Sequence, residues 1–108
     1  MKTFDLRQII QEQGGEKWRE FLRVPSLSMG VYRLGAGDKD GQSPHAEDEV
    51  YYVVSGRARF RAADIEKDVG PGTVIYVERL VDHRFFDISE DLTVLVFFAP
   101  AEGSLKDG

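Results

Sequence analysis

A chain of 108 residues with 42% hydrophobic and 31% charged residues is long enough for one globular domain with its own core, and too short for several domains. Its formal net charge of −5 argues against nucleic acid or an anionic membrane as a partner, because an acidic surface repels phosphate groups. The absence of cysteine excludes disulfides and thiolate chemistry. The chain has two histidines, His45 and His83, and any imidazole chemistry depends on them.

The sequence contains no pattern that predicts export or membrane insertion. Asp5 and Arg7 interrupt the segment in which a secretory signal would have its apolar core. The longest apolar run, residues 94–99, has six residues, whereas a membrane-spanning helix needs about 20. We therefore expect a cytoplasmic protein that does not contact a membrane.

The N-terminal segment has a helical pattern. Leu6, Ile9 and Ile10 follow the spacing of one helix face, and Asp5 can cap the first turn. Gly14 and the glycine after it end the pattern. We expect residues 1–16 to form an arm or a short helix before the main domain.

From Lys17 onward the hydrophobic pattern has a period of two, in short pieces separated by Gly, Pro, Asp and Ser. This is typical of an all-β sandwich or barrel, which we expect to cover residues 17–100. The polar tail, residues 101–108, is expected to end the domain or to cross to a partner as an arm. Ser55 and Gly56 are expected to form a hairpin turn. The expected strands lie near residues 17–24, 27–35, 46–54, 57–62, 65–69, 73–77, 82–88 and 92–98.

Two of these strands have informative patterns. Residues 57–62 alternate arginine with apolar side chains, which predicts a half-buried strand. In an acidic chain, such arginines are expected to pair with acids of a neighbouring strand or of a second subunit rather than with nucleic acid. Residues 93–98 are apolar on both faces, which is typical of a central strand covered on each side.

Acidic residues are concentrated around His45. Five acids and one lysine lie within residues 37–56, so this stretch carries most of the net negative charge. Asp38 and Asp40 are expected to be solvated, because exposed charge in a glycine-containing loop is common.

A possible metal site follows from spacing. His45, Glu47 and Glu49 are two residues apart, so a strand would place them on one face, and His83 is a donor from a distant strand. Two imidazoles and a carboxylate form a facial set that binds a transition metal and leaves coordination positions open. The alternative without metal pairs Glu49 with a protonated histidine and keeps the pocket as a binding cavity, since an unpaired buried carboxylate is costly.

Residues 43–56 resemble the first cupin motif. In that motif two histidines separated by one residue are followed by glutamate and then, after six residues, by glycine. His45 stands at the second histidine, Glu49 at the glutamate and Gly56 at the glycine.

Residues 70–85 look like the approach to the second cupin motif, with His83 as its ligand. The resemblance spans residues 27–98, most of the chain. It implies a single-domain cupin with a double-stranded β-helix, or jelly-roll, barrel.

The sequence departs from the cupin pattern at several positions. Ser43 replaces the first histidine, and we expect Glu47 as its replacement among the ligands. Residues 78–80 stand where the second motif has a Pro-x-Gly turn, so that turn must close differently. Asp87 stands at the final asparagine.

The resemblance also implies a homodimer and one divalent transition metal, Fe, Mn, Ni, Co or Zn. The metal would be held by His45, Glu49 and His83, next to a pocket for a small organic molecule. Tyr51 and Phe85 share strand faces with these ligands, so we place them at the pocket; core packing suits them equally.

Three functions agree with these residues. The first is a metal-binding cupin, with a metal-dependent non-haem oxygenase as the activity that the resemblance suggests. The second is a non-catalytic module that binds or senses a small ligand, since the first histidine is missing. The third is an isomerase of sugars or keto acids that uses Tyr or His as proton carrier. No catalytic residue is assigned.

Overall fold

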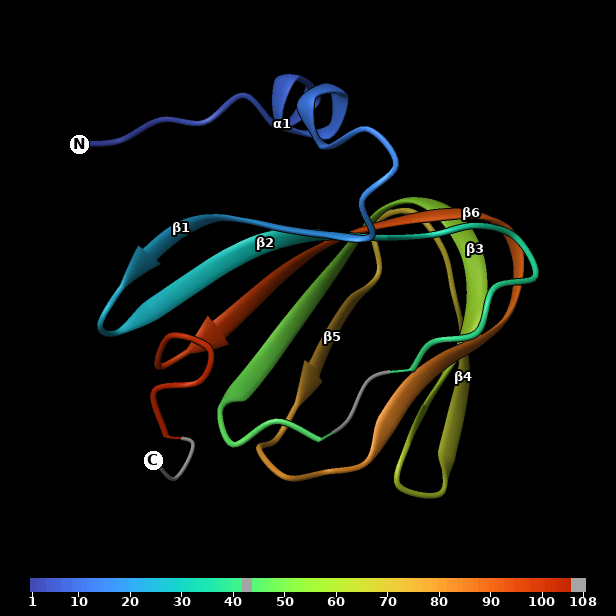
Figure 1. Ribbon diagram of the computed structural model, residues 1–108. Helices are drawn as coiled ribbons and strands as arrows, with labels where there is room; N and C mark the ends of the chain where they lie inside the picture. The colour runs from blue at the N-terminus through green and yellow to red at the C-terminus, as the bar shows by residue number, and fades with distance from the viewer. Residues whose placement is uncertain (42–43, 106–108) are drawn as a thin grey trace.

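A computed structural model describes residues 1–41 and 44–105, and these form one helix and six strands of a bent, barrel-like antiparallel sheet (Figure 1). The strand order is β1-β2-β6-β3-β4, and β5 also pairs with β3. This arrangement confirms the expected all-β fold with a short N-terminal helix. The elements are α1 (Leu6–Gln13), β1 (Trp18–Val24), β2 (Leu27–Leu34), β3 (Asp48–Ala62), β4 (Ile65–Val69), β5 (Val74–Val77) and β6 (His83–Ala99).

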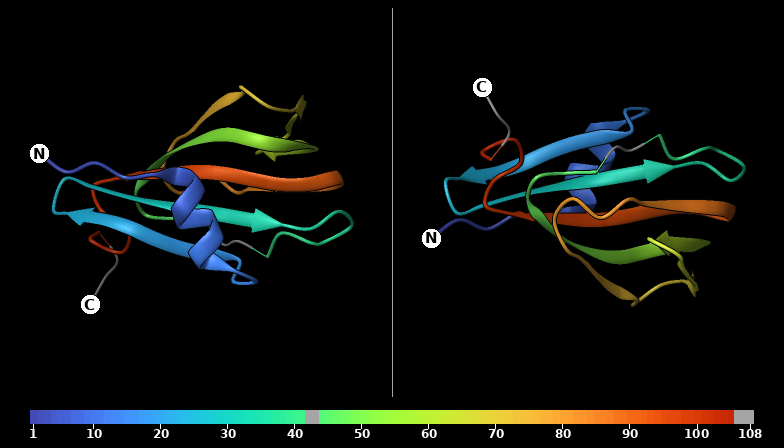
Figure 2. Two further views of the ribbon diagram at one scale, coloured as in Figure 1. Left: turned by 90° about the horizontal axis from the view of Figure 1, so that it is seen from above. Right: turned by 90° about the horizontal axis from the view of Figure 1, so that it is seen from below.

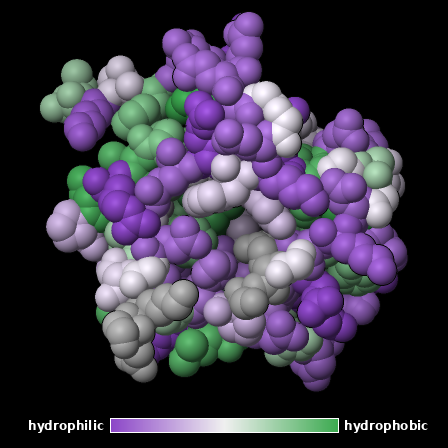
Figure 3. Space-filling view, viewed as in Figure 1, coloured by the Kyte–Doolittle hydropathy of each residue, from purple (hydrophilic) through white to green (hydrophobic). Residues whose placement is uncertain are grey.

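The helix α1 forms as its sequence predicts. Asp5 is the N-cap and its Oδ1 accepts a hydrogen bond from the Gln8 amide at 3.3 Å, while Gly14 caps the C-terminal end. The helix lies across the outer side of β1 and β2 (Figure 2). The buried Gln13 amide ties it there by donating to the Val31 carbonyl of β2 at 3.2 Å. In Figure 3, hydrophobic side chains gather near the N-terminal arm, where the Phe4 ring packs against Phe21 of β1.

The two longest strands, β3 and β6, run through both halves of the barrel. The first half of β3 pairs with the second half of β6, and the second half of β3 with the first half of β6, with register shifts between residues 53 and 59. The expected hairpin turn at Ser55 and Gly56 is therefore wrong, because both residues lie inside β3. Gly56 has a φ of 94°, and a Cβ there would lie 2.2 Å from the Asp91 carbonyl oxygen. A glycine allows the strand to bend against β6 at this point.

The barrel interior is filled by inward side chains of β2, β3, β4, β5 and β6. Its core combines aliphatic side chains with the rings of Tyr51, Phe60, Phe85 and Phe98. Trp18 of β1 packs edge-on against Phe98, with ring centroids 6.1 Å apart. β6 is central in the sheet, as expected; its inward side chains are buried, whereas Leu95 and Phe97 on its outer face are half-buried.

Asp40 is buried, so the prediction that it belongs to a solvated loop is wrong. Its Oδ1 accepts from the Tyr32 hydroxyl at 2.7 Å, and its Oδ2 accepts from the Phe85 amide at 2.9 Å. Burial and the hydrogen bond to Asp40 raise the pKa of the Tyr32 hydroxyl. Asp40 therefore fastens the loop after β2 to β2 and β6. Asp38 is exposed, as expected.

Two arginines of β3 pair with acids of neighbouring strands, as expected for arginines in an acidic chain. Arg57 Nε lies 3.3 Å from a Glu90 carboxylate oxygen of β6. Arg59 Nε donates to Asp68 Oδ1 of β4 at 3.1 Å, and its guanidinium also stacks over the Phe86 ring. These cations are neutralised within the fold.

Across residues 1–41 and 44–105, no helix has both the length and the apolar character needed to cross a membrane. The cytoplasmic location expected from the sequence stays a prediction.

The buried carboxylate of Asp40 predicts a large stability effect. Asp40→Ala leaves the Tyr32 hydroxyl and the Phe85 amide without their acceptor, so we expect a loss of about 3 kcal/mol in the free energy of unfolding. Asp38→Ala, the exposed control, removes one exposed bond to the Gly35 amide and should cost less than about 1 kcal/mol. Urea unfolding of both variants measures the difference; equal losses would contradict the role assigned to Asp40.

Candidate functional site

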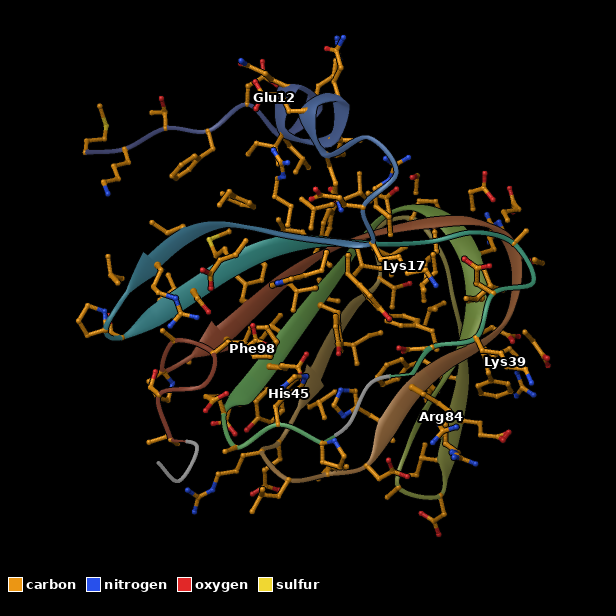
Figure 4. The ribbon with its side chains drawn as sticks, in the orientation of Figure 1. Glu12, Lys17, Lys39, His45, Arg84 and Phe98 are labelled. Atoms are coloured by element: carbon orange, nitrogen blue, oxygen red, sulfur yellow. The ribbon has the colours of Figure 1, made fainter. Side chains whose placement is uncertain are left out.

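A pocket of about 500 Å³ lies at the end of the barrel where β3 begins and β6 ends. Its walls come from the segment before β3, the turn between β5 and β6, and the segment after β6. Figure 4 shows His45 close to Phe98 in this region. The lining residues are Pro44, His45, Ala46, Glu47, Leu80, Glu102 and Gly103.

Glu49 and His83 form a buried pair inside the barrel. Glu49 is 1% exposed, and its Oε1 lies 3.1 Å from His83 Nε2. His83 Nδ1 donates to the Val81 carbonyl at 2.8 Å, which directs Nε2 toward Glu49 and the Tyr51 hydroxyl, 2.9 Å away. Burial alone lowers the pKa of His83, but its bonds to Glu49 and to the Val81 carbonyl raise it above the ordinary value overall.

His45 stands between this pair and the pocket. Its side chain is 23% exposed, and its Nε2 lies 3.9 Å from Glu49 Oε1. The ring packs edge-on against Phe98, with centroids 4.9 Å apart, and lies 6.2 Å from the His83 ring. The three donors expected from the sequence, on His45, Glu49 and His83, are therefore neighbours in space.

Glu47 directs its carboxylate to a different place. Its Oε1 accepts from the Gly103 amide at 3.0 Å and its Oε2 from the Leu105 amide at 3.1 Å. Both oxygens of this buried side chain are thus bonded to the segment after β6. Ser43, where the motif has its first histidine, lies outside the described residues.

Tyr51 and Phe85 lie in the aromatic core of the barrel. Both are fully buried, and each packs edge-on against Phe60. The Tyr51 hydroxyl contacts the site through His83, whose Nε2 lies within hydrogen-bond distance. Neither side chain is part of the pocket wall at His45.

The turn before β6 closes through Leu80 in place of a Pro-x-Gly sequence. Leu80 has a φ of 68°, the left-handed conformation that usually requires glycine. Its amide donates to the His45 carbonyl at 2.7 Å, and the Arg79 amide donates to Asp48 Oδ1 at 2.9 Å. The turn therefore joins the segment that carries His45 to the segment that carries His83.

Sequence reasoning missed Glu102 at this site. Its Oε2 lies 3.7 Å from His45 Nδ1, and it lines the pocket. Burial raises the pKa of Glu102, and the positive charge of a protonated His45 opposes that shift. The residue follows the last strand in a polar tail, where alternation gives no information on side-chain direction.

The described donors at this site have the chemistry of metal ligands but not the geometry of an assembled metal site. Within residues 1–41 and 44–105, no group of three or more His, Asp or Glu side chains has the geometry of a metal site. The chemistry nevertheless fits: two imidazoles adjoin a carboxylate whose Oε2 is buried without a hydrogen-bond partner among the described residues. Glu49 Oε1 lies farther from His45 Nε2, at 3.9 Å, than from His83 Nε2, at 3.1 Å, and His45 is the more exposed of the two histidines.

A family model for the cupin domain matches residues 30–98. The chain belongs to the cupin family. An uncharacterized protein of Streptomyces coelicolor, SCO3923, is 46% identical to this cupin over 104 residues, covering 94% of this chain and 99% of that protein.

Solved structures support the same fold. The TT1209 structure from Thermus thermophilus has a TM-score of 0.74 and 22% identity, covering 94% of this chain and 99% of that one. A Klebsiella pneumoniae protein with a double-stranded β-helix domain has a TM-score of 0.76 and 16% identity, covering 93% and 90% of the two chains. At these identities the likeness confirms the expected double-stranded β-helix and nothing about activity.

The left-handed Leu80 predicts that glycine is preferred over alanine there. Leu80→Gly and Leu80→Ala both remove a side chain that is 68% exposed, so they differ mainly in tolerance of a positive φ. We expect the glycine variant to be more stable than the alanine variant by about 1 kcal/mol. Thermal unfolding compares them; an alanine variant of equal or greater stability would contradict the strain.

Proposed function

We propose that this cupin binds one divalent transition metal ion through His45, Glu49 and His83 and presents it to a small organic molecule in the adjoining pocket. The observation that carries the proposal is the Glu49 carboxylate, which is buried beside two imidazoles and has one unpartnered oxygen among the described residues. Iron, manganese, nickel, cobalt and zinc all accept such a donor set.

The physical argument concerns the cost of burying Glu49. A carboxylate withdrawn from water loses solvation that hydrogen bonds or a cation must replace. His83 compensates one oxygen at 3.1 Å, whereas Oε2 stays without a partner in the described part of the chain. A divalent cation next to this oxygen would remove the remaining cost. Binding requires the partly exposed His45 to approach Glu49.

In this proposal, neighbouring residues orient the ligands and shape the pocket. Tyr51 and the Val81 carbonyl orient His83, and Phe98 supports the His45 ring. A bound metal would supply Lewis acidity and open coordination positions for an oxygen-bearing ligand. Leu80 and the neighbouring apolar wall would exclude water from one side of that ligand.

One observation favours a second candidate, a ligand-binding module without metal. His83 Nε2 already lies within bonding distance of Glu49 and of the Tyr51 hydroxyl, so protonated His83 can neutralise the carboxylate by itself. In that case the pocket binds its ligand through His45 and Glu102 without an ion. Metal titration separates the two candidates.

The metal proposal predicts stoichiometric uptake of one divalent transition metal. Calorimetric titration of purified protein, with elemental analysis of the product, should give one equivalent per chain. Glu49→Gln should weaken binding by at least about 100-fold, which corresponds to about 2.7 kcal/mol, because a neutral amide is a poor ligand. Glu66→Gln, on the exposed strand β4, is the matched control and should bind like the wild type.

Two histidine variants complete this test. His83→Ala should abolish uptake, and His45→Ala, at a more exposed position, should do so with less effect on folding. Absence of uptake by the wild type for all five metals would overturn the proposal in favour of the metal-free module. If uptake is found, oxygen consumption by the Fe(II) form with catechols, diketones or thiols tests for oxygenase activity.

We also propose that two copies associate through the outer face of the sheet. Register places Val74 and Tyr76 of β5 beside Tyr52 and Val50 of β3, and these beside Leu95 and Phe97 of β6, on one face. Val74 and Tyr76 are 64% and 63% exposed. A contiguous apolar and aromatic face of this kind is typical of a homodimer interface.

The dimer proposal predicts that a charge on this face separates the copies. Tyr76→Glu should convert a dimer to a monomer, because a buried unpaired carboxylate at an interface is costly. Ile65→Glu is the matched control, since Ile65 is 64% exposed but lies at the β3–β4 hairpin. Light scattering after size-exclusion chromatography gives the masses; a monomeric wild type, or dissociation by both variants, would contradict the assignment.

A further inference from the structure

The segment after β6, residues 100–105, folds back toward the start of β3 and forms one wall of the pocket (Figure 1). The Glu102 amide donates to Ser28 Oγ at 2.9 Å, and the Glu102 carbonyl accepts from Arg23 at 2.8 Å. The next amide, of Gly103, donates to the buried carboxylate of Glu47. The backbone at Glu102 is therefore held from both sides, and its side chain is kept at the pocket.

The Glu102 carboxylate faces the outer nitrogen of His45. Its Oε2 lies 3.7 Å from His45 Nδ1, while the opposite nitrogen, Nε2, lies 3.9 Å from Glu49 Oε1. Glu49 Oε1 is already shared with His83 Nε2 at 3.1 Å. A proton on Nδ1 would face the Glu102 oxygen, and a proton on Nε2 would face the Glu49 oxygen. The Glu102 oxygen is the nearer of the two and is not shared with His83, so it favours the proton on Nδ1.

His83 shows the same arrangement in complete form. Its Nδ1 donates to the Val81 carbonyl, which fixes the tautomer and directs Nε2 toward Glu49. A histidine that binds a metal through one nitrogen generally donates the other N–H to a carbonyl or carboxylate, and this partner orients the ring. Glu102 is the acceptor that faces the corresponding nitrogen of His45, at 3.7 Å.

We propose that Glu102 is a positioning residue that keeps the proton of neutral His45 on Nδ1 and so leaves Nε2 available as a ligand. Glu47 acts one step further away, because its two hydrogen bonds hold the segment that carries Glu102. The consequence for metal binding rests on the proposed function, whereas the tautomer of His45 is a property of the metal-free chain.

The first experiment measures that tautomer directly. The chain has two histidines, so a long-range ¹H–¹⁵N spectrum of metal-free protein labelled at histidine contains two ring systems, which His83→Gln assigns. At a pH where His45 is neutral, we expect the Nδ1–H form in the wild type. Glu102→Ala should move the population toward the Nε2–H form, and Glu102→Gln, whose amide oxygen still accepts, should retain more of the Nδ1–H form.

The second experiment measures metal affinity of the same variants by calorimetry. Glu102→Ala should weaken binding by about 10–100-fold, and Glu102→Gln should weaken it less. Glu66→Ala, on β4 in the other half of the barrel, is the control for loss of a carboxylate and should leave both readouts unchanged. Glu47→Ala should change both readouts in the direction of Glu102→Ala.

The outcomes separate this inference from the proposed function. An unchanged His45 tautomer in Glu102→Ala overturns the role of Glu102, even if the wild type binds metal. A wild type that takes up no metal overturns the proposed function, while the tautomer measurement still decides on Glu102.

Discussion

Pairing between β3 and β6 is the interaction on which the rest of the molecule depends. Each strand contributes to both halves of the barrel, and together they bring Glu49, early in β3, next to His83, at the start of β6. The register shifts near Gly56 let the pair bend, so the inward face of one half turns toward the inward face of the other. The enclosed space buries a carboxylate and an imidazole together, and this shared burial gives their bond its strength.

The elements could be predicted from the sequence to the extent that local patterns determine them. Helical spacing with a cap at Asp5 located α1, and alternation located the strand regions, because side-chain direction in regular structure follows a fixed period. The expected breaks at residues 55–56 and 89–91 are wrong, since β3 and β6 each run through them as one strand. Gly56 is where the local pattern misleads, because a glycine after a serine is a common turn signal. Only the approach of the β6 backbone shows that this glycine allows a bend within β3.

The site was predictable in part. Matching strand positions and the cupin motifs indicated that His45, Glu49 and His83 would be neighbours, and their separations of 3.1 and 3.9 Å agree with this. Parity also grouped Glu47 with them, but β3 begins at Asp48, so strict alternation extends to neither His45 nor Glu47, and of these two only His45 lies next to Glu49. Both oxygens of Glu47 and the Oδ2 of Asp40 accept from backbone amides far along the chain, and no local pattern specifies such contacts.

The packing of Trp18 has an optical consequence. It is the one tryptophan of the chain, and its indole packs edge-on against Phe98, which in turn packs against His45. Gly30 makes room for this indole, since a Cβ there would lie 2.3 Å from the Trp18 ring. Fluorescence from a single indole, two ring contacts from His45, therefore gives an intrinsic spectroscopic signal at this end of the barrel, without a label or an added chromophore.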